Sequence, residues 1–248
     1  GESAGQAGDL GTVTTLTGDV AVLGTMKAGP ELTAHHIKVQ KGEILLDQEA
    51  ELAVDAAVRA ATARNHTCTH LLHKALKNVL GGHVNQAGSL VSPDRLRFDF
   101  SHVSAMTAEE LAKVEDEVNA AILLDAPVVI EELGIEAARA KGATALFGEK
   151  YGDVVRVVEV PGVSMELCGG THIGATGQAG SFYILSESGV AAGTRRIEAV
   201  TGLNALRHVR EMRGELDEAL KTVKAKPGEL GARVKKLLEE IKALGKDK

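Results

Sequence analysis

Two pairs of side chains that lie far apart in the sequence constrain this fold most strongly. His66 and His70 stand four residues apart, so both imidazoles project from one face if the segment is helical. Cys168 and His172 supply a thiol and an imidazole at the same spacing. If both pairs bind one ion, the fold must bring these two stretches of the chain together. That requirement excludes any arrangement that keeps the two stretches in separate domains.

The second pair is expected in a tight loop. Gly169 and Gly170 lie between its members, and a glycine in a helix interior costs about 1 kcal/mol relative to alanine. Three imidazoles and one thiolate suit tetrahedral zinc, whereas magnesium and calcium prefer oxygen ligands. With only two cysteines in the chain, the combination predicts a zinc site. A closed structural site that only pins a helix to a loop is an open alternative, because four protein ligands usually mark structural zinc.

The residues around the first pair narrow the chemistry. Thr67, Cys68 and Thr69 lie between the two histidines, so the general-base glutamate of an HExxH metalloprotease is missing. A peptidase is therefore a poor interpretation. We expect Cys68 to be a small buried hydrophobe. His73, one turn further on, is a competing candidate ligand.

Composition excludes other classes of protein. Hydrophobic residues make up 44% of the 248 residues and charged residues 25%, without an apolar run of membrane-span length, so we expect a soluble protein. Two distant cysteines form no disulfide framework, which favours a reducing cytoplasm. A net charge of −6 means that any nucleic acid would have to bind a local patch. With few aromatic residues to stack on bases, RNA would be held by its backbone and the shape of its end.

The hydrophobic pattern predicts an α+β fold in three parts. Short alternating segments broken by glycines predict a small antiparallel β-barrel in residues 1–62. Near residue 62 the period becomes helical and ends at Gly81 and Gly82. We expect a second α/β region with a mixed or antiparallel sheet to occupy residues 63–202.

Further signals place elements inside this second region. Residues 89–91 and 96–100 indicate a hairpin, and Thr107 with Glu110 forms a capping box for a helix to about residue 124. The remaining strands are expected near residues 128–131, 154–160, 182–186 and 195–200. Residues 203–248 are rich in lysine, glutamate and leucine and are interrupted by Pro227 and Gly228. This pattern predicts two amphipathic helices that pack as a hairpin or against a partner, including a second copy of the chain.

Five segments together resemble the editing domain of alanyl-tRNA synthetase. They are RNHTCTHLLH at 64–73, GHVNQAGSL at 82–90, RFDFSH at 97–102, ELCGGTH at 166–172 and residues 190–202. The opening resembles the β-barrel before that domain, and the tail resembles the start of the helical part of the C-terminal domain. The threonyl-tRNA synthetase editing domain shares the histidine and cysteine pattern but matches the other segments less well. The opening residues carry no targeting signal, and we expect a part of a longer polypeptide.

The resemblance implies functional residues. Zinc would be bound by the residues matching His66, His70, Cys168 and His172, while Thr69 and Gln86 would lie in the substrate pocket as catalytic or recognition residues. For contacts to the substrate or the tRNA end we infer Arg195, Gly169 and Gly170. An ion pair on the strand surface is an equally open role for Arg195. ATP and Mg²⁺ would belong only to the aminoacylation domain of that family, because this segment has no ATP-binding signature.

The resemblance implies hydrolysis of Ser-tRNA(Ala) and Gly-tRNA(Ala) by an aminoacyl-tRNA deacylase. A pocket for alanine cannot exclude glycine, and an apolar pocket rejects an added hydroxyl by only about 100-fold. A second site that hydrogen-bonds the serine hydroxyl discriminates by a factor on the order of 10⁴ to 10⁵, because alanine would leave its polar groups unpaired. Two alternatives stay open: a free-standing alanyl-tRNA editing protein, and a zinc-stabilised module that binds the acceptor end of tRNA(Ala) without catalysis.

Overall fold

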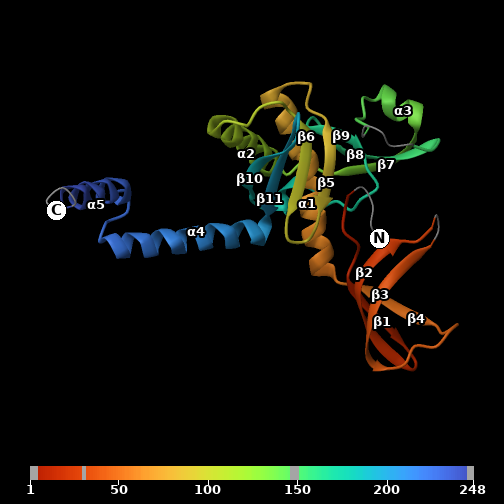
Figure 1. Ribbon diagram of the computed structural model, residues 1–248. Helices are drawn as coiled ribbons and strands as arrows, with labels where there is room; N and C mark the ends of the chain where they lie inside the picture. The colour runs from red at the N-terminus through yellow and green to blue at the C-terminus, as the bar shows by residue number, and fades with distance from the viewer. Residues whose placement is uncertain (1–4, 30–31, 146–150, 245–248) are drawn as a thin grey trace. The chain divides into compact units, whose positions relative to one another are not determined.

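The computed structural model describes residues 5–29, 32–145 and 151–244, and it confirms the α+β class. The helices accompany antiparallel sheets with strand orders β3-β2-β1-β4, β10-β11-β6-β5 and β7-β8-β9 (Figure 1). The chain divides into two compact units, Gly1–Asn204 and Ala205–Lys248. All residues predicted to form the functional site belong to the first unit.

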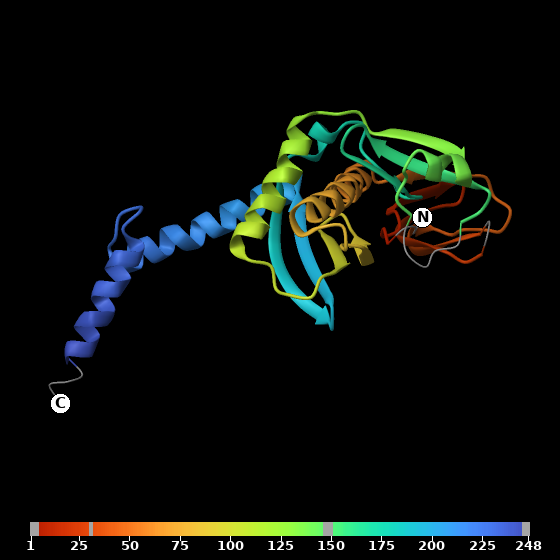
Figure 2. The same ribbon diagram turned by 90° about the horizontal axis from the view of Figure 1, so that it is seen from above.

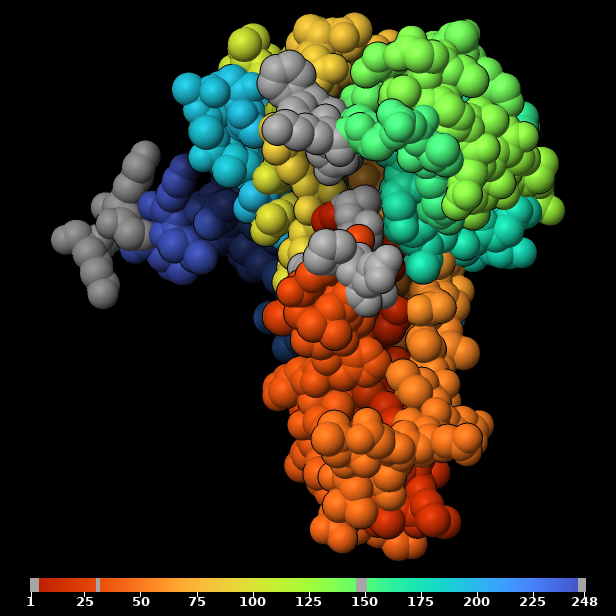
Figure 3. Space-filling model, turned by 90° about the vertical axis from the view of Figure 1, so that its right-hand side faces the viewer, coloured from red at the N-terminus to blue at the C-terminus, as the bar shows by residue number. Residues whose placement is uncertain are grey.

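The N-terminal sheet contains β1 (Gly11–Thr15), β2 (Gly18–Lys27), β3 (Thr33–Gly42) and β4 (Ala50–Val54). β1 pairs with both β2 and β4, whereas β3 pairs only with β2 in the described part of the chain. Because β3 and β4 stay unpaired with each other there, the sheet is open, which corrects the predicted barrel. The sheet stays open because its strands enclose no buried interior that closure would complete. Val20 and Val22 on β2 are buried, but β4 is exposed throughout and β3 nearly so (Figure 3).

A long helix, α1 (Ala56–Leu80), carries the first pair of predicted ligands. It begins earlier than the apolar period indicates, because the Asp55 carboxylate accepts hydrogen bonds from Ala57 N and Val58 N, each at 3.0 Å. It ends as predicted at Gly81, whose φ of 117° favours glycine. The predicted boundary at residue 62 lies inside this helix. The three-part domain division stays a prediction.

The central layer pairs helices with the sheet formed by β5 (Gln86–Val91), β6 (Leu96–Ser101), β10 (Phe182–Ala191) and β11 (Thr194–Thr201). α1 and α2 (Ala108–Leu123) pack together on one face of this sheet (Figure 2). Phe98 and Phe100 from β6 are fully buried against Leu72 and Leu76 of α1 in one hydrophobic cluster. The predicted capping box at Thr107 is present. The hairpin and the capped helix are therefore confirmed.

A smaller sheet places the second pair of predicted ligands. It contains β7 (Val129–Gly134), β8 (Val154–Val160) and β9 (Ser164–Leu167), with the short helix α3 (Ile135–Ala140) packed against it. The sequence analysis missed α3 and β9, both too short to show a period. β9 contacts α1 and ends immediately before Cys168. A loop then leads to the short 3-10 helix η1 (Thr176–Ala179), so the predicted loop is confirmed.

The C-terminal segment forms the two predicted helices, α4 (Gly202–Val223) and α5 (Leu230–Leu244). No residue of α5 is buried, and it leaves α4 at an angle after the turn at Pro227 and Gly228 (Figures 1 and 2). The pair therefore does not pack as a tight hairpin. Packing against a partner, the other expectation, fits the large apolar side chains that α4 and α5 leave exposed, among them Leu206, Leu216, Leu238 and Ile241.

None of the helices in the described ranges combines the length and apolar character needed to cross a membrane.

Candidate metal centre

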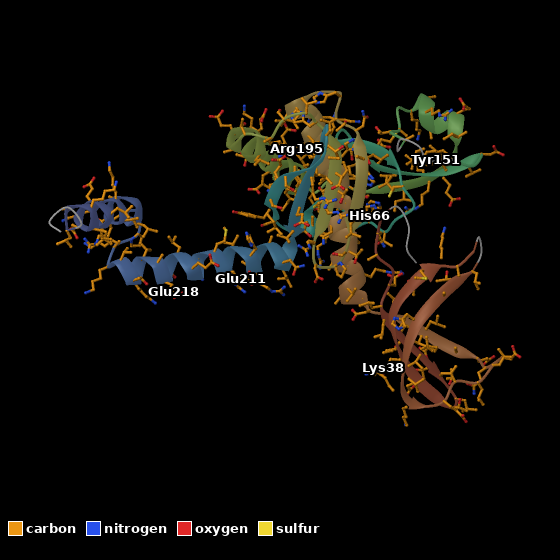
Figure 4. All side chains as sticks on the ribbon, in the orientation of Figure 1. Lys38, His66, Tyr151, Arg195, Glu211 and Glu218 are labelled. Carbon is orange, nitrogen blue, oxygen red and sulfur yellow. The ribbon has the colours of Figure 1, made fainter. Side chains whose placement is uncertain are left out.

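The four predicted metal ligands meet inside the first unit. α1 presents His66 and His70 from one face, and the loop after β9 brings Cys168 and His172 against them. One ligand atom from each residue lies within 4.8 Å of all the others. His66 Nε2 is 3.3 Å and His172 Nε2 3.4 Å from Cys168 Sγ. His66 lies at the centre of the unit (Figure 4), and only His172 of the four is partly exposed.

The environment keeps the three imidazoles neutral. Burial is the main cause that lowers the pKa of His66 to about 3, with smaller contributions from His70 and Arg156. Burial also lowers the pKa of His172 well below its usual value. For His70 burial lowers the pKa against the opposing effect of Glu166. Neutral imidazole is the form that binds metal, so the cluster is ready to accept an ion at neutral pH.

Gln6 fixes the orientation of the first ligand. Its Oε1 accepts hydrogen bonds from Thr171 N and Thr171 Oγ1 at 2.9 Å, and lies 2.8 Å from His66 Nδ1. Because an amide oxygen only accepts, Nδ1 carries the proton, and the Nε2 lone pair faces Cys168. Gln6 is 2% exposed. It therefore ties the helix to the loop and selects the metal-binding tautomer of His66.

Thr67 has the corresponding place at His172. Its Oγ1 lies 3.1 Å from His172 Nδ1 and accepts a hydrogen bond from Ile173 N at 3.3 Å. Thr67 therefore contacts Nδ1 of His172, the ring nitrogen that faces away from the Cys168 thiol. Its counterpart, Nε2, stays directed at Cys168.

The loop can approach the helix only because of a glycine. A Cβ on Gly170 would lie 2.0 Å from Cε1 of His66, which no side chain tolerates. Gly170 N donates to Cys168 Sγ at 3.4 Å. Arg156 holds the loop from the other side, because its Nη1 donates to the carbonyls of Cys168 and Gly170, both at 2.7 Å. Gly169, by contrast, is exposed.

The sequence that carries these four residues is similar to known proteins. Residues 155–198, which include the Cys168 and His172 loop, match the model of the threonyl and alanyl tRNA synthetase second additional domain. Alanine–tRNA ligase of Nitratidesulfovibrio vulgaris is 57% identical over 247 residues, covering 100% of this chain and 28% of that protein. The ligases of Oleidesulfovibrio alaskensis and Acetivibrio thermocellus are 58% and 53% identical, over 100% and 99% of this chain and 28% of each ligase.

Nearly the whole chain is therefore similar to one segment of alanine–tRNA ligases. It spans about 28% of the length of the ligases that it matches, so the matches concern one segment of those proteins.

Thr69 and Gln86, which the family resemblance assigns to a substrate pocket, are engaged locally in the structure. The Thr69 hydroxyl donates to the carbonyl of Asn65 in the preceding helical turn, at 2.9 Å. Gln86 on β5 donates through Nε2 to Ser89 Oγ at 3.2 Å. These bonds would have to be exchanged for substrate contacts. The pocket assignment stays a prediction.

Arg195 on β11 (Figure 4) forms an ion pair with Glu187 on β10. Its Nε donates to one carboxylate oxygen and its Nη2 to the other at 2.8 Å. The hydrogen bond to Glu187 is the main reason that the pKa of Arg195 is raised. An ion pair on the strand is the alternative role that the sequence left open, although this one is largely buried, and a tRNA contact through Arg195 or the loop glycines stays a prediction.

Two neighbouring residues fall outside the four-residue cluster. Cys68 is fully buried, and burial raises the pKa of its thiol to about 12, which confirms it as an inert core residue. His73 places Nδ1 2.9 Å from Glu166 Oε1 instead of joining the cluster. Burial opposes ionisation of Glu166, but the interactions with His70 and His73, including the hydrogen bond to His73, outweigh it and lower the pKa of Glu166.

Sequence reasoning missed Gln6, Thr67 and Arg156 as supporting residues. None of them stands at a metal-ligand spacing. Only the folded chain brings Gln6, from the N-terminal segment, against His66.

Proposed function

We propose that this chain is an editing hydrolase that cleaves the ester of Ser-tRNA(Ala) and Gly-tRNA(Ala). The observation that supports it most is the convergence of His66, His70, Cys168 and His172 on one point in a segment that matches alanine–tRNA ligases. A cytoplasmic location, where thiols stay reduced, belongs to the same proposal.

The ion that fits these donors is Zn²⁺. Three nitrogens and one sulfur, without a carboxylate among the four, bind zinc in preference to magnesium or calcium. The neutral imidazoles and the contacts from Gln6 and Thr67 support the same assignment. When bound, zinc supplies Lewis-acid character at the point where the aminoacyl group would lie.

The chain's own residues would select and present the substrate. Thr69 lies on α1 between the two histidine ligands, and Gln86 supplies an amide from β5. Hydrogen bonds from these side chains to the serine hydroxyl would favour serine over alanine, because a methyl group leaves them unpaired. The acceptor end of tRNA(Ala) would have to be held by local contacts, since the chain carries a net charge of −6.

The decisive experiment compares ester hydrolysis with metal content. Wild-type protein, Cys168→Ala and Gln86→Ala are incubated with Ser-tRNA(Ala) and correctly charged Ala-tRNA(Ala), and zinc is measured in each preparation. We expect wild type to hydrolyse the seryl ester and spare the alanyl ester. Cys168→Ala should lose both zinc and hydrolysis, and Gln86→Ala should keep zinc while hydrolysis slows. Full hydrolysis by zinc-free Cys168→Ala would contradict the proposal.

A second candidate is a tRNA-binding module in which zinc is purely structural. It is favoured by the four protein ligands, since catalytic zinc usually keeps one position open. Binding of tRNA(Ala) with no hydrolysis of any charged form would select it. Whether the chain acts inside a ligase or as a free-standing editing protein is decided by the open reading frame that encodes it.

Self-association through the C-terminal helices is a separate part of the proposal. The exposed apolar side chains of α4 and α5 support it. Sedimentation of the full chain and of a chain ending at Gly202 tests it, since only the full chain should form a larger species.

A further inference from the structure

A polar cavity lies beside the candidate metal centre, and none of the four proposed ligands lines it. It measures about 310 Å³, within the range of small-molecule sites. α1 contributes His73, Lys74 and Lys77 to its wall. The opposite wall comes from β9 and the turn before it, including Ser164 and Glu166.

Two buried polar atoms of the lining residues have no hydrogen-bond partner in the described structure. They are Nε2 of His73 and Oγ of Ser164. His73 is 3% exposed, and its other nitrogen, Nδ1, lies 2.9 Å from Glu166 Oε1. Since a carboxylate accepts, Nδ1 donates to it, and Nε2 is left without a partner. Buried polar groups are normally paired, so both atoms are suited to a ligand that brings a hydroxyl or an ammonium group.

The charged residues of the lining carry both signs. Lys74 and Lys77 supply ammonium groups, and Glu159 and Glu166 supply carboxylates. A purely anionic ligand such as a phosphate would meet the two carboxylates, and a purely cationic ligand would meet the two lysines. A small zwitterion matches the whole set.

We propose that this cavity binds a free amino acid with a side-chain hydroxyl. Its carboxylate faces the lysines, its ammonium group faces the glutamates, and its hydroxyl satisfies Ser164 and His73. The inference does not depend on ester hydrolysis, because it concerns a free amino acid and residues outside the four-ligand cluster.

Titration of the full chain with L-serine, followed by calorimetry, tests the proposal. We expect saturable binding of L-serine and binding of L-alanine weakened about tenfold, the ratio that follows from one lost hydrogen bond of about 1.4 kcal/mol. Ser164→Ala should weaken serine binding at least about fivefold, as should Lys74→Ala, whose exposed position leaves the fold intact. Lys113→Ala, an equally exposed lysine on α2, is the matched control and should bind like wild type.

Cys168→Ala separates this cavity from the metal centre. Serine binding that survives in Cys168→Ala but falls in Ser164→Ala and Lys74→Ala supports the proposal. Binding lost in Cys168→Ala and kept in the two cavity variants would place the amino acid at the metal and overturn it. Absence of serine binding to the wild-type chain would overturn it as well.

Discussion

At the scale of single residues, the geometry of the candidate metal centre depends on residues outside its four proposed ligands. The ring of His66 occupies the space that a side chain on residue 170 would need, and Gln6 and Thr67 each contact the outward nitrogen of a histidine ligand. Such contacts usually change metal affinity by about 10- to 100-fold. Substitutions at these supporting residues therefore test how the ligands are positioned without removing a ligand.

Gly170→Ala is expected to abolish tight zinc binding. Its new Cβ would fall 2.0 Å from Cε1 of His66, so the ring or the loop must move and one ligand leaves the cluster. Gly174→Ala is the matched control in the same loop, because its nearest neighbour, Gln178 Nε2, would be an ordinary 3.6 Å away. Competition with a zinc-binding dye measures both. Equal zinc affinity in the two variants would contradict the prediction.

Thr67→Val and Thr69→Val should behave differently although they stand two residues apart. Thr67→Val removes the oxygen beside His172 Nδ1 and should weaken zinc binding about 10- to 100-fold. Thr69→Val removes a hydroxyl whose partner among the described residues is the backbone of Asn65, so zinc should stay while discrimination of serine from alanine falls. Zinc affinity and hydrolysis of both Ser-tRNA(Ala) and Ala-tRNA(Ala) are read from the same preparations. Loss of zinc in Thr69→Val alone would reverse the assigned roles.

The residue pattern predicts the four candidate ligands but not the residues that hydrogen-bond to them. A spacing of four residues is a local property of a helix or loop, so His66, His70, Cys168 and His172 are identifiable without coordinates. The contact between Gln6 and His66 joins residues that only tertiary structure brings together. No local pattern encodes it.

At the scale of elements, α1 brings the first ligand pair to the site, and its beginning was hidden from the sequence pattern. Its first turns are largely exposed, whereas the buried positions begin at Thr62, so the apolar period starts late. The start is set by Asp55, whose side chain accepts from two backbone N–H groups. The turns that follow the cap are alanine-rich, with Arg59 as the one charged residue in 56–61, so they show no helical alternation of apolar and polar positions. The helix end at Gly81 was predictable because glycine itself is the signal.

Removal of the cap should destabilise the protein without touching the metal centre. Asp55→Ala leaves two N–H groups at the start of α1 unpaired and should lower the free energy of unfolding by about 1 kcal/mol. Asp55→Asn keeps an oxygen acceptor and should lie close to wild type. Urea unfolding of the zinc-free chains gives both values. A loss of the same size in both variants would point to the charge rather than the cap.

At the scale of the molecule, the class of fold was predictable because helix and strand periods differ over long stretches. Closure of the N-terminal sheet was not, since it depends on whether two distant edge strands meet. β3 and β4 show neither pairing with each other nor an inward buried face, and the alternating pattern that suggested a barrel also fits an open sheet. The same limit applies to α4 and α5. Their amphipathic pattern predicted helices but did not determine what covers them.

The three buried imidazoles make the stability of the metal-free chain depend on pH. Each has a folded-state pKa below its ordinary value, about 3 for His66 against 6.5, so the unfolded chain binds more protons than the folded chain below about pH 6.5. Stability contributed by these groups is therefore complete above that pH and is lost as the pH falls towards the folded values. Each proton taken up only on unfolding costs about 1.4 kcal/mol per pH unit.

Urea unfolding of zinc-free protein between pH 7.5 and 5 is expected to show this loss, steepest at the acid end. This pH range lies above 4.5, the ordinary pKa of Glu166. Because the pKa of Glu166 is lowered in the folded chain, its titration affects stability only below this range. His66→Asn removes one of the titrating groups and should make the decline shallower, whatever its effect on stability at pH 7.5. Because zinc binds the neutral rings, saturating zinc should raise stability most at the upper end of the range. A free energy of unfolding that stays level from pH 7.5 to 5 in the zinc-free wild type would mean that the imidazoles are solvated, and the close-packed cluster would then be wrong.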